Sequence, residues 1–462
     1  MKNKSSFFQN LMTAFLAQGI SLLCSIFMSF IIPKYIGIEE YSYWQLFIFY
    51  VGYVGFFHFG FTDGIYLRLG GKKYEELDYE NIGTQFKLFA IMVFFFSLLL
   101  IVVASVSFPS PQRKFVWIMT GVYLLIQNLT ACLGYLFQAV NKTKIFSLST
   151  ILDRVLVLIF IALLLLGKQD RFEPFVVAYT LGKMGALIYC VCLARKIVFA
   201  RFGNVRGVLP EMWLNFSTGI KLTIANIMGM LILGTGRIII DNIWGIESFG
   251  KVSLSLSLAN FFLIFIQQVS MVLFPALRRT GVERQKEIYH KLLSCLDLLL
   301  PAAFIAYFPM KAIVGWWLPQ YGESVRYLAL LLPLCLFDGK MQMLCNTYLK
   351  VLRKEKKLLQ FNLCAFCMSL CLGACSGYAF HSMDCVVLSM VLSVMFRSII
   401  SELYLARQMG IDIVRTMAME VALALAFVSA AWFFNGWLSF GITAAAYAAY
   451  LFLNRNSIRN IM

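Results

Sequence analysis

The chain has 462 residues, of which 60% are hydrophobic and only 14% are charged. Soluble domains are usually about 45–50% apolar and about 25% charged, and the apolar excess here extends over the whole length, with a mean hydropathy of +0.78. This composition excludes a soluble globular enzyme, a disordered protein and a disulfide scaffold. The formal net charge of +17 is explained by the Lys and Arg residues that membrane proteins gather on cytoplasmic loops, rather than by nucleic-acid binding.

Continuous apolar stretches of about 20 residues recur from Leu11 to Leu453. Each is long enough to cross a hydrocarbon core of about 30 Å as a helix, whereas a membrane β-barrel would show short alternating segments. The sequence therefore predicts an all-α polytopic membrane protein with about 14 transmembrane helices. The predicted spans are 11–32, 42–63, 84–106, 114–138, 146–166, 174–198, 215–238, 248–275, 291–310, 324–350, 357–380, 384–407, 415–435 and 437–454.

The basic residues assign a sidedness to these spans. If the N-terminus is cytoplasmic, 25 of the 40 Lys and Arg residues fall in cytoplasmic segments and seven fall in outer segments. This excess alternates loop by loop, as the positive-inside rule requires. The run 11–32 is too long for a signal-peptide core, so we expect it to be an uncleaved first span. We expect a multi-pass membrane protein with both termini cytoplasmic and loops too short to hold a catalytic domain.

Three short sequence matches indicate an internal repeat. In order along the chain, with offsets of 208, 212 and 212 residues, 37–42 resembles 245–250, 142–144 resembles 354–356, and 193–195 matches 405–407. They predict two six-helix halves in parallel repeat, 1–205 and 206–410, followed by two extra transmembrane helices in 411–462. Parallel repeats of this kind are typical of transporters. Two similar bundles can rock against each other and open the cavity between them to one face at a time.

The same segments resemble a known family. Residues 33–41 (PKYIGIEEY), 137–144 (FQAVNKTK), 237–241 (RIIID) and 245–250 (GIESFG) are similar to polysaccharide flippases of the multidrug/oligosaccharidyl-lipid/polysaccharide exporter superfamily. The family often has an Asp-Arg pair where this chain reads Gly236-Arg237, and Asp241, one turn later, is the candidate substitute. The resemblance implies twelve to fourteen helices around a central, often cationic cavity. It also implies the movement of an oligosaccharide repeat unit on a polyprenyl diphosphate, for O-antigen or capsule synthesis, from the cytoplasmic to the outer leaflet.

Several basic residues lie inside the predicted spans or near their ends. An ionisable group at membrane depth costs about 2.5–3.5 kcal/mol on insertion scales, so it should face the bundle interior or water. Arginine suits a diphosphate because its planar fork meets phosphate oxygens in a bidentate way. The candidate substrate-binding cations are Arg397, Lys183, Arg154, Lys340, Arg237 and Lys221. The alternative is internal ion pairing, with the partners Asp153, Asp297, Asp338, Glu402 and Glu420.

Other charged residues are candidates for gating or ion coupling. Asp63 and Arg68 flank the cytoplasmic mouth of the second span, where they form either a gate pair or a helix-end cap. Asp338 and Asp297 are candidates for coupling to H⁺ or Na⁺, and Asp241 is grouped with them. The chain has no P-loop, so direct ATP use is not expected. We expect no cofactor and no metal centre, because the 12 cysteines lie mainly in apolar runs and only three His are present.

The sequence thus predicts a transporter, not an enzyme, that flips a lipid-linked oligosaccharide by alternating access. Its expected partners are the polyprenyl-diphosphate-linked oligosaccharide, membrane lipids, a coupling ion (H⁺ or Na⁺) and polymerase or biosynthesis-complex proteins, with no nucleic acid. One alternative is a small-molecule or multidrug antiporter of the same superfamily, although organic cations would favour an acidic cavity. A membrane polysaccharide polymerase is a further alternative, which the short outer segments disfavour.

Overall fold

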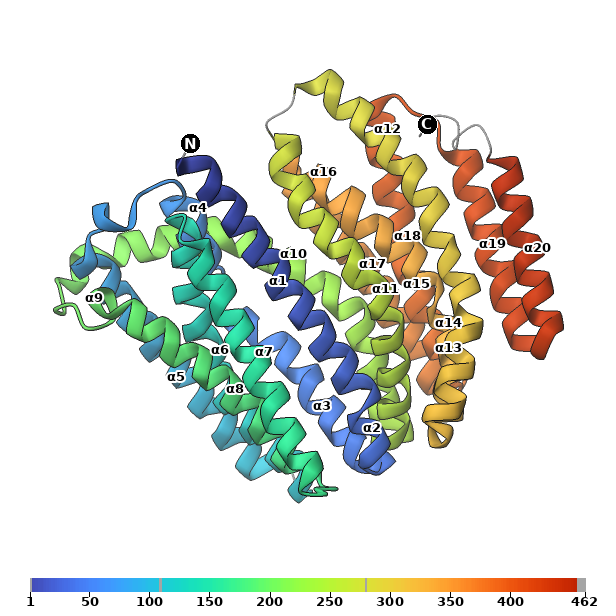
Figure 1. The fold of residues 1–462 in the computed structure, drawn as a ribbon, viewed down its shortest axis with the longest axis horizontal. Coiled ribbons are helices and arrows are strands. Elements are labelled where there is room, and N and C mark those ends of the chain that lie inside the picture. The colour runs from blue at the N-terminus through green and yellow to red at the C-terminus, as the bar shows by residue number, and fades with distance from the viewer. Residues whose placement is uncertain (1, 108–109, 279–280, 455–462) are drawn as a thin grey trace. The chain divides into compact units, whose positions relative to one another are not determined.

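The computed structural model describes the backbone of residues 2–107, 110–278 and 281–454, together with their side chains apart from 2–11, 14, 15, 264–276, 278 and 282 (Figure 1). Every regular element in these ranges is a helix, which confirms the predicted all-α class. The chain divides into two compact units, Met1–Ile227 and Met228–Met462. The division falls within α10 (Val205–Trp244), whereas the repeat predicts a boundary at 205/206, just before this helix.

The first unit is a bundle in which helices both near and far apart along the chain pack together. Helix α6 packs against α3, α4, α5, α7 and α8, and α1 packs along α7. Its elements are α1 (Lys2–Phe30), α2 (Ile32–Tyr35), α3 (Ile38–Val54), η1 (Gly55–His58), α4 (Phe61–Leu69), η2 (Tyr74–Glu76), α5 (Tyr79–Ser107), α6 (Pro111–Ala139), α7 (Thr143–Leu166), α8 (Phe172–Leu193), α9 (Arg195–Val198) and the first part of α10.

The second unit contains the remaining helices, of which α18 packs against α14, α15 and α17. Helices α19 and α20 lie side by side (Figure 1) and contact α14 and α13, respectively. Its elements after α10 are α11 (Ile246–Arg278), α12 (Val282–Leu299), η3 (Leu300–Ala302), α13 (Ala303–Trp317), η4 (Pro319–Tyr321), α14 (Gly322–Leu331), α15 (Pro333–Lys340), η5 (Met341–Cys345), α16 (Asn346–Val351), α17 (Glu355–Ala374), η6 (Cys375–Ala379), α18 (Met383–Met409), α19 (Val414–Phe433) and α20 (Gly436–Leu453).

Each of the predicted spans falls on a helix or on a bent pair of helices. Among the described residues, 11 helices are long and apolar enough to cross a membrane, or up to 13 if each bent pair is one span. The predicted span 248–275 falls on α11, part of whose side chains lie outside the described residues. The protein is therefore a multi-pass helical membrane protein.

Two spans are broken rather than continuous, which the hydropathy pattern does not show. The helices Ile38–His58 and Phe61–Leu69 meet at 56°, because Phe59 and Gly60 adopt left-handed backbone angles with φ of 49° and 87°. Glycine adopts this conformation without strain. The predicted second span 42–63 therefore contains a break, and its last helix continues to Leu69.

The second break lies in the predicted span 324–350, where Pro319–Leu331 and Pro333–Val351 meet at 46°. Pro333 lacks an N–H group and starts α15, since proline is well suited to the first turn of a helix and poorly suited to its interior. Eight residues later the backbone forms one π turn, η5, directly after Lys340. Such π turns often lie at functional sites, so this segment is a candidate for one.

Candidate functional site

In the first unit, a cluster of charged and aromatic side chains joins α7 to α8. We call it the Asp153 cluster: Asp153 and Arg154 on α7, and Tyr179 and Lys183 on α8. Lys183 Nζ lies 2.7 Å from Asp153 Oδ2, and Arg154 Nε lies 3.9 Å from the same oxygen. Arg154 Nη1 donates to the Tyr179 hydroxyl at 3.1 Å.

Helices α7 and α8 can pack closely at this cluster because α8 has a glycine, Gly182, at the contact. A Cβ atom on Gly182 would lie 2.4 Å from Val157 Cγ2 and 3.1 Å from the backbone oxygen of Asp153. Tyr179 and Lys183 are four residues apart on α8, so they share one face of the helix. The Asp153 side chain exposes 3% of its surface, whereas Lys183 exposes 13% and Arg154 24%. The two cations are thus paired with Asp153 and remain partly accessible.

Aromatic rings surround the Tyr179 end of this cluster. Tyr179 stacks on Tyr123 of α6 at 5.6 Å and makes edge contacts with Trp44 and Phe47 of α3 at 5.7 and 6.0 Å. Trp44 exposes 1% of its surface, so it belongs to the core of the unit. The phenol of Tyr179 therefore has a packed position from which it orients Arg154.

The break between η1 and α4 forms a second polar site in the first unit. His58 Nδ1 accepts a hydrogen bond from the Gly60 N–H at 2.9 Å. Asp63 Oδ2 accepts one from Thr223 Oγ1 at 3.0 Å, and Arg68 Nη1 donates to Asn215 Oδ1 at 2.7 Å. The predicted gate residues Asp63 and Arg68 are therefore each bonded to a side chain of α10.

In the second unit, Lys340 lies among three carboxyl groups, and we call these four residues the Lys340 cluster. Its ammonium nitrogen is 2.6 Å from Asp297 Oδ1 of α12, 3.2 Å from Glu402 Oε1 of α18 and 2.6 Å from Glu420 Oε1 of α19. Tyr450 of α20 places its hydroxyl 3.0 Å from the Asp297 backbone oxygen and 3.4 Å from Glu420 Oε1. Lys340 is 1% exposed, so its ammonium group is paired inside the protein.

Asp338, two residues before Lys340, binds another predicted cation. Its Oδ1 pairs with Arg397 Nη2 of α18, and its Oδ2 accepts a hydrogen bond from Gln342. Arg397 is 7% exposed, and its Nε lacks a hydrogen-bond partner among the described residues. One guanidinium donor of Arg397 is therefore available for a further acceptor.

The remaining candidate residues lie on α10. Arg237 donates from Nε and Nη2 to Ser253 Oγ at 3.2 and 2.7 Å, with its guanidinium 4.8 Å from the Phe249 ring. Asp241 is 8% exposed, one turn after Arg237, and Lys221 is exposed. Lys221 and Arg237 belong to different compact units.

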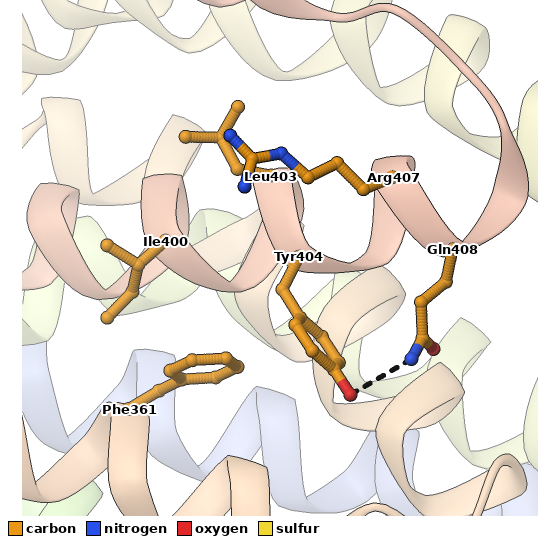
Figure 2. A pocket seen from close by; sticks show the side chains of 6 residues that line it. All are labelled: Phe361, Ile400, Leu403, Tyr404, Arg407 and Gln408. Atoms are coloured by element: carbon orange, nitrogen blue, oxygen red, sulfur yellow. Dashed lines mark hydrogen bonds between the residues drawn. The ribbon is translucent and has the colours of Figure 1, made fainter.

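An open pocket of about 500 Å³ lies between α17 and α18 (Figure 2). None of the residues proposed from the sequence as site residues lines it. Figure 2 shows Gln408 donating to the Tyr404 hydroxyl, at 2.9 Å, beside the Phe361 ring. The lining consists of Phe361, Ile400, Leu403, Tyr404, Arg407 and Gln408.

A sequence profile described as "Polysaccharide biosynthesis protein" matches residues 7–281, more than half of the chain. The chain belongs to this family. No curated protein sequence matches it. The polysaccharide biosynthesis class that the sequence motifs indicate is thereby confirmed.

Solved structures share the fold of this family member. A structure titled "Lipid II flippase MurJ, inward closed conformation" matches with a TM-score of 0.70 and 12% identity, over 96% of this chain and 99% of that chain. An inward-facing multidrug resistance MATE family transporter of the MOP superfamily matches with a TM-score of 0.59 and 12% identity, over 85% and 94%. A mutant of the Vibrio cholerae MATE transporter VcmN matches with a TM-score of 0.58 and 12% identity, over 87% and 97%. The protein therefore has the fold of these transporters.

Sequence reasoning named the ionic partners of the buried cations but missed the phenols that complete both clusters. Tyr179 orients Arg154, and Tyr450 lies against Glu420. The spacing of Tyr179 and Lys183 by four residues was a usable signal, since it places both on one helix face. Tyr450 lies far from Lys340 in the sequence, so only the packing of α20 could reveal its role.

Proposed function

We propose that this member of the polysaccharide biosynthesis protein family is a flippase of the bacterial inner membrane. Its substrate would be an oligosaccharide repeat unit on a polyprenyl diphosphate, moved from the cytoplasmic to the outer leaflet for O-antigen or capsule synthesis. The observation that carries the proposal is the family match over residues 7–281. The fold shared with a structure titled as a lipid II flippase supports it.

The described cations support an anionic headgroup as cargo. Arg154 and Lys183 keep part of their surface accessible although both pair with Asp153. Arg397 retains an unused Nε–H, which fits a phosphate oxygen. We assign these three residues, with Lys221 and Arg237, to substrate binding, and we place Lys340 within its carboxyl cluster.

The proposed cycle is alternating access between the lobes predicted from the repeat. We assign the gate to Asp63 and Arg68, because both lie just after the bend at Phe59–Gly60, where a broken helix supplies a hinge. Asp338, Asp297 and Asp241 are the proposed coupling acids for H⁺ or Na⁺. An interior-negative potential helps to expel uncompensated negative charge, by about 2.3 kcal/mol per charge per 100 mV.

A deletion strain tests the substrate class. We expect lipid-linked oligosaccharide to accumulate on the cytoplasmic leaflet, measured by its accessibility to a membrane-impermeant modifying enzyme in right-side-out and inverted vesicles. An unchanged distribution between the leaflets rejects the flippase. Arg397→Ala should abolish complementation at normal protein level, whereas Arg415→Ala, which removes an exposed cation at the start of α19, should complement fully.

The second candidate function is a multidrug antiporter, which the fold shared with MATE transporters favours. The acidic excess around Lys340 also suits a protein that exchanges cations. Efflux of fluorescent organic cations from cells that overproduce the protein separates the two functions. Efflux with unaltered sidedness of the lipid-linked oligosaccharide would select the antiporter.

A further inference from the structure

The Lys340 cluster contains more acidic than basic groups in a region that excludes water. The side chains of Lys340, Asp297, Glu402 and Glu420 expose between 1% and 7% of their surface. All four residues lie on helices that are candidate membrane spans. If every group were ionised, three negative charges would surround one positive charge. Buried charges are tolerated only when they are balanced.

Among the residues that the structure describes, the surroundings of the cluster do not supply the missing positive charge. The nearby guanidinium of Arg397 is already paired with Asp338, so those two groups balance each other. The other titratable groups that act on the cluster are neutral in their ordinary states. They are Tyr289 of α12, Cys345 of η5 and Tyr450 of α20.

A second observation concerns one oxygen in the cluster. Asp297 Oδ1 is buried and lies 2.6 Å from Lys340 Nζ, yet it makes no hydrogen bond among the described residues. The Lys340 ammonium donates instead to Glu402 Oε1 and Glu420 Oε2, at 3.2 and 2.7 Å. A buried polar atom without a hydrogen bond requires an explanation. A proton shared among the carboxyl groups of the cluster provides one, because a protonated carboxyl oxygen donates a hydrogen bond whereas an ionised one only accepts.

We propose that the Lys340 cluster is a proton-binding site, in which two of the three carboxyl groups carry protons in the folded protein. One ionised carboxylate then faces the single ammonium group, and the cluster is neutral. Like-charged carboxyl groups that share a site cannot all ionise together. Their protons therefore belong to the cluster as a whole and leave it in coupled steps.

The distances indicate which carboxyl group stays ionised. Glu420 has both oxygens close to the ammonium nitrogen, at 2.6 and 2.7 Å, and its Oε1 lies 3.4 Å from the Tyr450 hydroxyl. A carboxylate that receives several donors is favoured in its charged form. Glu402 makes the longest contact, at 3.2 Å, and Asp297 Oδ1 lacks a hydrogen bond. We assign one proton to Glu402, and the other belongs to the cluster as a whole.

The position of the cluster gives this proton site a structural consequence. Glu420 and Tyr450 belong to α19 and α20, whereas Asp297, Lys340 and Glu402 belong to α12, α15 and α18. Loss of both protons would place two uncompensated negative charges at the point where the C-terminal helix pair joins the rest of the unit. Proton release therefore weakens the attachment of α19 and α20, and the π turn after Lys340 lies at the same point.

Infrared spectroscopy of the purified full-length protein tests the proposal directly. Protonated carboxylic acids show a carbonyl band that shifts in heavy water, and ionised carboxylates do not show it. We expect this band in the wild-type protein at pH 7, and we expect its loss as the pH rises. Glu402→Gln, which mimics the neutral acid, should remove about half of the band. Glu420→Gln should leave most of it.

Glu323→Gln is the matched control, because Glu323 is 67% exposed, lies on α14 of the same unit and pairs with Lys251 at 2.6 Å. It should leave the band unchanged. If a cluster variant does not fold, isotope-labelled aspartate and glutamate in the wild-type protein identify the protonated side chains without any substitution. A wild-type spectrum with no deuterium-sensitive carboxylic acid band, or with a band that neither label shifts, overturns the proposal. The measurement needs no substrate, so it stands or fails independently of the flippase.

Discussion

Substitution of Lys183 by methionine removes the closest cation from a buried aspartate while keeping an unbranched side chain. The lost contact is the 2.7 Å ion pair between Lys183 Nζ and Asp153 Oδ2. The Asp153 side chain is 3% exposed, so water has little access to replace the ammonium group. The remaining cation is Arg154, whose Nε lies 3.9 Å from the same oxygen and whose Nη1 is bonded to Tyr179.

The expected loss of stability follows from these contacts. Removing one partner of a buried ion pair costs about 3–5 kcal/mol. Protonation of the stranded carboxylate sets an upper limit, because adding a proton to an aspartate of ordinary acidity costs about 4 kcal/mol at pH 7. Arg154 offsets part of the loss, so we expect Lys183→Met to destabilise the folded protein by about 2–4 kcal/mol at pH 7. At pH 5 the same protonation costs about 1.5 kcal/mol, so the loss should shrink as the pH falls.

Thermal unfolding of the purified protein in detergent, followed at pH 5 and pH 7, measures this effect. Asp153→Asn combined with Lys183→Met should lose less stability than Lys183→Met alone, since no charge is then left unbalanced. Lys144→Met removes an exposed lysine from the first turn of α7 and should leave the midpoint of thermal unfolding unchanged. The reasoning is refuted if Lys183→Met unfolds like the wild type, or if the double variant is the less stable of the two.

Three further predictions concern the first unit. Gly219→Val should destabilise it by about 3 kcal/mol, because a Cβ at Gly219 would lie 1.9 Å from the Gly60 backbone oxygen, and thermal unfolding measures the loss. Asn215→Ala should cost about 1–3 kcal/mol and increase amide exchange in α4, since Arg68 loses its 2.7 Å acceptor; unaltered exchange in α4 would contradict this. Hydrogen bonds to its own backbone N–H and to Lys142 lower the pKa of the exposed Glu75 carboxyl. Ionised Glu75 therefore contributes its full stabilisation of the folded state above the ordinary carboxyl pKa, and this stabilisation is lost as the pH falls through the lowered pKa. Wild-type protein should thus show more proteolysis of this loop in acid, and Glu75→Gln should remove that rise.

The sequence predicted the helical class and the position of each span because hydropathy is a local property. A helix such as α5 is apolar over most of its length, so its burial in lipid does not depend on which neighbour it contacts. Hydropathy did not predict the breaks at Phe59–Gly60 and before Pro333, because both lie inside apolar runs that have the length of one span.

The charges inside those spans, and the acids available to pair with them, were predicted by residue type, but which acid pairs with which cation was not. The sequence showed that Lys183, Lys340 and Arg397 need compensation, because an isolated charge in a span is costly. Which acid compensates each one depends on helices that lie far apart along the chain, as Asp338 and Arg397 do. Only the tertiary packing brings three carboxyl groups to one ammonium at Lys340, because this contact requires four helices to meet at one depth.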